Sequence, residues 1–127
     1  MIAEVDPFDL PEWLGEGAVV WRPVSGIGGH HVIGELTSDG GGQLPCDLLA
    51  VDEAYPKPVA DDELRHQAHQ AWRHGQVLLI DLDGRLTMAV PGTSFTADTV
   101  LDAITRLAKA VGAPPSSYSV RLRLGGD

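Results

Sequence analysis

The sequence has little of what marks a secreted or membrane protein. A single cysteine, Cys46, excludes an intramolecular disulfide and so a disulfide-stabilised secreted scaffold. No apolar run approaches the roughly 18 residues that a spanning helix needs. The N-terminus lacks a basic start followed by an apolar run, so we expect no signal peptide and a cytoplasmic location.

Basic side chains are scarce, above all in the first half of the chain. Nine Lys and Arg stand against eighteen Asp and Glu, which gives a formal net charge of -9. Residues 1–63 contain two basic side chains, Arg22 and Lys57, against thirteen acidic ones. Such a surface repels phosphate backbones and anionic head groups, so we expect no nucleic acid or membrane partner. A basic partner protein would complement this negative charge. The alternative is that the acidic side chains only keep the protein soluble.

The composition predicts one ordinary globular domain. The chain has 127 residues, of which 43% are hydrophobic, and no internal repeat or linker-like stretch divides it. We therefore expect a single α+β domain over residues 1–127. Residues 1–16 contain two prolines and five acidic side chains with little periodicity, so we expect an irregular acidic N-terminal arm.

Periodicity and turn signals predict the order βββ-α-ββ-α-β. The apolar run 77–82 predicts a strand buried on both faces and central in the sheet. Asp83-Gly84 predicts a type I′ hairpin turn, and Thr96 predicts the N-cap of the second helix. We expect a mostly antiparallel sheet of about six strands with two helices on one face. The expected strands cover residues 18–24, 30–37, 44–52, 77–82, 85–90 and 118–124, and the first helix covers 61–74.

The first expected helix carries a polar row opposite its apolar side. Helical spacing places His66, His69 and Arg73 close together and away from Leu64 and Ala68. Two histidines at i, i+3 can share a metal, and His69 with Arg73 can hold an anion. The simplest interpretation is that this face of the helix is exposed to solvent, and we expect no cofactor. The alternative is a metal ion bound by His66 and His69. The third ligand of a metal would come from His74, Asp81, Asp47 or the pair His30 and His31.

The N-terminal arm carries large apolar side chains in an acidic context. Phe8, Leu10, Trp13 and Leu14 resemble the aromatic anchors of a short motif that docks into a groove on another protein. They are our candidate partner-binding residues. The alternative is that the arm folds back over its own sheet and covers an edge or an apolar face, because a small domain needs its large side chains for the core.

Two segments suggest catalysis, and both have simpler interpretations. Residues 77–86 resemble the first motif of the haloacid dehalogenase-like phosphatases, in which a hydrophobic strand ends in Asp-x-Asp-Gly-Thr. The resemblance implies Asp81 as nucleophile and Asp83 as general acid, both holding magnesium. Arg85 stands in place of that threonine and residues 85–90 alternate as a returning strand, so we interpret the segment as a hairpin. Cys46 lies in a strand-like pattern, which favours a buried thiol.

The sequence therefore favours a small non-catalytic protein-interaction domain, such as a regulator, a chaperone or an immunity-type partner. The alternative is a small enzyme or a ligand, anion or metal binder that uses His66, His69 and Arg73. A homodimer is compatible with either function, because the basic outer row of the last strand, Arg121 and Arg123, can meet the acidic half of a second copy.

Overall fold

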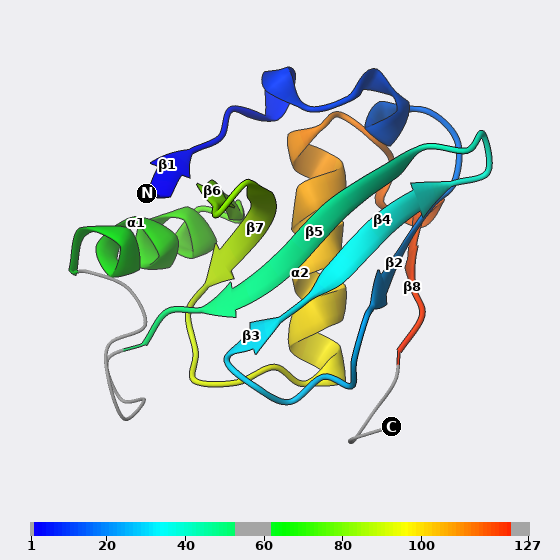
Figure 1. The fold of residues 1–127 in the computed structure, drawn as a ribbon. Helices are drawn as coiled ribbons and strands as arrows, with labels where there is room; N and C mark the ends of the chain where they lie inside the picture. Colours follow the sequence, from blue (N-terminus) through cyan, green and yellow to red (C-terminus); the bar gives the residue numbers. More distant parts are fainter. Residues whose placement is uncertain (1, 53–61, 123–127) are drawn as a thin grey trace.

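A mixed β-sheet with two α-helices forms the framework of the protein (Figure 1). The computed structural model describes residues 2–52 and 62–122, and the elements below lie within these ranges. The strands are β1 (Ile2–Glu4), β2 (Val19–Pro23), β3 (His31–Val32), β4 (Gly34–Ser38), β5 (Gln43–Ala50), β6 (Leu78–Leu82), β7 (Arg85–Val90) and β8 (Tyr118–Val120). The helices are α1 (Asp62–Arg73) and α2 (Ala97–Ala110), with short 3-10 turns η1 (Pro7–Asp9), η2 (Glu12–Gly15) and η3 (Pro115–Ser117).

The α+β class expected from the sequence is confirmed, but the sheet is larger and more mixed than expected. Its strand order is β1-β6-β7-β5-β4-β2-β8, and β3 pairs with β5 beside β4. The pairs β5–β7 and β2–β8 are parallel, and the other pairs among the described residues are antiparallel. Two strands were not expected separately: β1 comes from the arm, and the expected strand 30–37 divides at Ile33 into β3 and β4.

The two helices pack on opposite faces of the sheet and not on one face as expected. Successive side chains of a strand point to opposite faces. Along β5, Cys46 and Leu48 enter the main core with α2, whereas Leu49, and Val51 just after the strand, enter a second core with α1. The apolar run of β6 follows the same alternation, with Leu79 on the α2 side. That run is therefore buried on both faces as expected, but its strand lies second from the edge.

The local signals of the second half are confirmed. The hydroxyl of Thr96 accepts the N–H of Thr99 at 3.2 Å and caps α2. Asp83 and Gly84 have φ of 56° and 81°, the two left-handed residues that a type I′ hairpin requires. The last strand is shorter than expected: β8 ends at Val120, while the expected end at Leu124 lies outside the described residues.

The N-terminal arm closes one edge of the sheet through β1, and beyond that strand it consists of the turns η1 and η2 with their connecting loops. Strand β1 pairs antiparallel with β6, and the N–H of Val5 donates to the carbonyl of Leu79. Leu14 is fully buried in the main core, and the hydroxyl of Tyr118 donates to its carbonyl at 2.6 Å.

Neither α1 nor α2, the two α-helices of the described residues, has the length and apolar character that a membrane-spanning helix needs.

Trp21 of β2 packs closely against Gly34 of the neighbouring strand β4. The indole of Trp21 is fully buried, and its Nε1 donates to the carbonyl of Cys46 at 2.9 Å. A Cβ atom at Gly34 would lie 2.5 Å from the Trp21 ring, closer than real side chains approach. Glycine is therefore required at this position by space and not by backbone conformation.

Candidate functional site

The histidine row of α1 is exposed and borders a shallow hollow. His66, His69 and Arg73 are exposed, while Leu64 and Ala68 on the opposite side are buried in the second core. A hollow of about 340 Å³ is lined by Asp52, Arg65, His66 and His69. The structure thus brings the two histidines together beside a carboxylate, whereas Arg73 does not line the hollow.

Three of the five third metal ligands named from the sequence, Asp47, His31 and Asp81, are engaged elsewhere. Asp47 and His31 contact each other in a separate cluster, and the carboxylate of Asp81 accepts the N–H of Gly84 at 2.9 Å. Within residues 2–52 and 62–122, no three His, Cys, Asp or Glu side chains lie close enough to hold a metal ion together. The geometry therefore offers His66 and His69 as at most a two-histidine site with Asp52 nearby.

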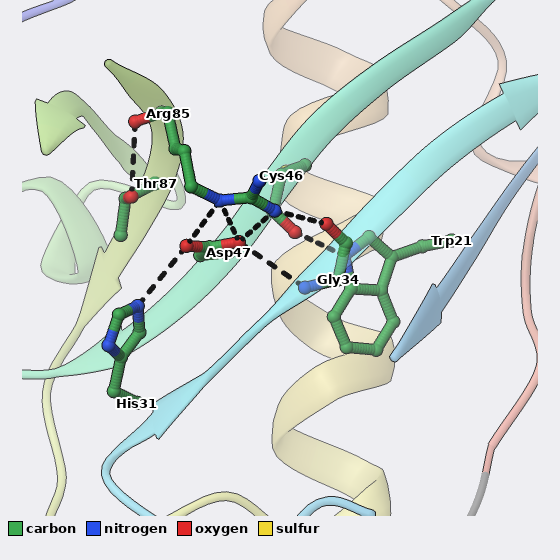
Figure 2. Close-up of polar contacts among 7 residues, drawn as sticks. All are labelled: Trp21, His31, Gly34, Cys46, Asp47, Arg85 and Thr87. Carbon is green, nitrogen blue, oxygen red and sulfur yellow. Dashed lines mark hydrogen bonds and ion pairs between the residues drawn. The ribbon is translucent and has the colours of Figure 1, made fainter. Parts of the chain in front are cut away.

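An extensive polar cluster in the described part of the chain surrounds the buried carboxylate of Asp47, which is 2% exposed (Figure 2). Arg85 donates to it from Nε, at 3.1 and 3.0 Å, and from Nη2 at 2.8 Å. The N–H of Gly34 donates to Oδ1 at 3.3 Å, and Nε2 of His31 lies 3.2 Å from Oδ2. Arg85 also donates to the carbonyl of Gly34 at 3.1 Å. One carboxylate thus connects β3, β4, β5 and β7.

This cluster is organised to hold strands together. The fork of Arg85 matches the carboxylate of Asp47, and burial strengthens such charge-assisted bonds. Hydrogen bonding to Asp47 is the main reason that the pKa of the Arg85 guanidinium lies above its usual value. From the sequence, Asp47 was expected only as a metal ligand and Arg85 only as a departure from the phosphatase motif. The missed signal was a lone carboxylate in an apolar strand, which requires a cationic partner.

Cys46 and the pair Asp81 and Asp83, the two catalytic candidates from the sequence, both have structural roles. Cys46 is fully buried on the α2 side, and burial, aided by the charge of Asp47, raises the pKa of its thiol. Asp81 and Asp83 belong to the antiparallel β6–β7 hairpin, where Asp83 takes a left-handed turn conformation. The hairpin interpretation of residues 77–86 is therefore confirmed.

A further hollow, of about 460 Å³, lies between β1, the start of β6 and the C-terminal half of α2. Arg106 on its wall stacks over the Trp72 ring, 3.5 Å from the centroid. The same guanidinium donates to the carbonyls of Trp72 and Gln76 and lies 3.4 Å from the carboxylate of Asp102. Its donors are thus engaged in joining α1 to α2, which leaves little for a ligand.

The turn η1 and its flanks form a surface that we call the acidic end. Phe8 is 96% exposed, the highest value among the large apolar side chains of the described residues. Beside it, Pro7, Leu10, Pro11, Gly15 and Val111 contribute to a hollow of about 410 Å³. The acidic end carries exposed carboxylates at Asp6, Asp9, Glu12 and Glu16.

The far ends of β2 and β8 form a second surface, which we call the basic end. Arg22 and Arg121, both exposed, line a hollow of about 380 Å³ together with Pro23, Val24 and Leu122. Val24 is 62% exposed, second only to Phe8 among those large apolar side chains. In the described part of the chain, no carboxylate lies within ion-pair distance of Arg22 or Arg121.

The four partner-binding candidates of the arm differ in their exposure to solvent. Phe8 is exposed, Leu10 and Trp13 are half-buried against the main core, and Leu14 is inaccessible to a partner. The acidic end and the basic end were not predicted as surfaces from the sequence, although Phe8 and Arg121 were each candidates. Comparison of the chain with protein-family models, with curated proteins and with solved structures found no match, so the surfaces above rest on geometry and charge.

Proposed function

We propose that this protein is a non-catalytic interaction domain that binds another protein through its acidic end. The observation that carries the proposal is the exposure of Phe8. A phenyl ring that is 96% exposed contributes almost nothing to the stability of its own chain. On binding, an aromatic side chain of this kind buries about 150–250 Å² and becomes a natural anchor.

The backbone that carries Phe8 is already ordered in the free protein. Asp6 caps η1 by accepting the N–H of Phe8 at 3.0 Å. The N–H groups of Asp9 and Leu10 donate to the carbonyls of Asp6 and Pro7. Because the turn is preformed, docking of Phe8 costs little further backbone entropy, which favours affinity.

The charges around Phe8 define the chemistry of the partner. Exposed carboxylates at Asp6, Asp9 and Glu12 flank the ring. They favour an apolar pocket with Lys or Arg on its rim, and they disfavour phosphate backbones and anionic lipid. The partner that fits is therefore a protein with a basic-rimmed apolar pocket.

Site-specific cross-linking tests this proposal. A photoreactive phenylalanine analogue is placed at position 8, and at the exposed α2 position Leu101 as the matched control. We expect a protein cross-linked from position 8 and not from position 101. The purified cross-linked protein is then titrated, and Phe8→Ala should weaken binding about tenfold or more while Leu101→Ala leaves it unchanged. Equal binding by both variants, or no cross-link specific to position 8, would overturn the proposal.

A second candidate function, ligand or metal binding by His66 and His69, is favoured by the hollow that they share with Asp52. Titration calorimetry with Zn²⁺ and with inorganic phosphate tests it. Binding that disappears in the His66→Ala and His69→Ala variants would support it, and unchanged or absent binding would dismiss it. Arg73→Ala is the matched control, because Arg73 lies outside the hollow.

A further inference from the structure

We infer that the pocket which receives the acidic end is the basic end of a second copy of this chain. This inference rests on the proposed function and names its partner. Four large apolar side chains are exposed in the described residues: Phe8, Val24, Ile33 and Leu101. The two most exposed, Phe8 and Val24, lie in surfaces of opposite charge.

Each end provides an apolar side chain and a hollow for the other. The 380 Å³ hollow beside Arg22 and Arg121 exceeds a cavity of about 150 Å³ that accepts benzene, so it has room for the ring of Phe8. Its apolar lining comes from Pro23, Val24 and Leu122. In return, the 410 Å³ hollow beside Phe8 has room for the smaller side chain of Val24.

The charges match in the same arrangement. Two arginines lie side by side at the basic end. In the parallel pairing of β2 with β8, Trp21 lies opposite Val120, and the N–H of the next residue, Arg121, donates to the carbonyl of Trp21. Arg121 therefore lies beside Arg22. Glu35 on β4 lies opposite Arg22 in the register of β2 with β4. Carboxylates of Asp6, Asp9 and Glu12 from a second copy would supply the missing counter-charge.

The geometry prevents the two ends of one molecule from meeting. The acidic end precedes β2, whereas Arg22 and Pro23 of the basic end form the last residues of β2, so the two surfaces lie at opposite ends of this strand (Figure 1). Contact must therefore form between molecules. Such a contact joins two different surfaces, and it produces either an antiparallel dimer with both contacts made or a head-to-tail chain.

The experiment measures self-association of the full chain by sedimentation velocity over a wide range of protein concentration. We expect concentration-dependent association that weakens as salt rises, since exposed charges are screened. Phe8→Ala and the double variant Arg22→Glu/Arg121→Glu should each weaken it about tenfold or more. Leu101→Ala and Lys109→Glu, which alter exposed positions outside both ends, are the matched controls and should associate as the parent does.

Mixing the two defective variants gives the sharpest test. Phe8→Ala keeps an intact basic end, and Arg22→Glu/Arg121→Glu keeps an intact acidic end, so a mixture can form one complete contact. We expect a heterodimer in the mixture that neither variant forms alone. A parent that stays monomeric, or association that the variants leave unchanged, would overturn the inference. A position-8 cross-link to a different protein would overturn it too, while leaving the proposed function intact.

Discussion

Asp47 and Arg85 form the ion pair that ties strand β5 to strand β7, with the carboxylate buried and the guanidinium at the surface of the cluster. Arg85→Met should lower the free energy of unfolding by about 3 kcal/mol, because it leaves a buried charge with only Gly34 and His31 as partners. Urea unfolding measures this loss. The double variant Asp47→Leu/Arg85→Met should recover part of it; a double variant less stable than Arg85→Met would show that the unpaired carboxylate is not the cause.

Gly34→Ala should destabilise the protein by about 1–3 kcal/mol, because the added methyl group overlaps the buried ring of Trp21. The same substitution should cost less in a Trp21→Phe background, where the smaller ring leaves space. Thermal unfolding of the four proteins gives the coupling between the two positions. Equal costs in both backgrounds would mean that the strain lies elsewhere.

Stability should fall at alkaline pH because burial raises the pKa of the Cys46 thiol. An unfolded thiol ionises near pH 8.5 while the folded one stays protonated, so the unfolded state loses a proton that the native state keeps. The protonated Cys46 thiol therefore contributes its full share of stability below this pH and loses it as the pH rises. Between pH 9 and pH 10 the free energy of unfolding should fall by about 1 kcal/mol. Unfolding at both pH values should show a smaller difference for Cys46→Ala. An identical pH slope for that variant would assign the effect to other groups, such as Tyr118, whose pKa burial also raises.

Phe8→Ala should change the free energy of unfolding by less than about 0.5 kcal/mol, as an exposed side chain does. Leu14→Ala, six residues along the same arm, should lower it by about 2–5 kcal/mol because Leu14 is fully buried. Chemical unfolding of the two variants separates binding residues of the arm from core residues. A large loss for Phe8→Ala would indicate that the ring packs within the protein.

Local signals in the sequence predicted the elements well and their arrangement less well. The cap at Thr96 and the turn at Asp83 are encoded by neighbouring residues, and both were predicted. The placement of α1 and α2 on opposite faces depends on strand pairing, which joins residues far apart in sequence, such as Leu48 and Met88. Counting charges along the sequence showed that the first half is acidic. It did not show that Arg22 lies beside Arg121, because strand pairing brings these distant residues together.

The parallel pairing of β2 with β8 also bears on how the chain becomes folded. Trp21 lies beside Val120 in this pair, and the hydroxyl of Tyr118 reaches the carbonyl of Leu14. During synthesis, β2 has β4 as a neighbour early, but its other edge waits until residues 118–120 have left the ribosome. Contacts of such long sequence separation slow folding, so we expect the nascent chain to expose this edge to chaperones or to aggregation until its last strand arrives.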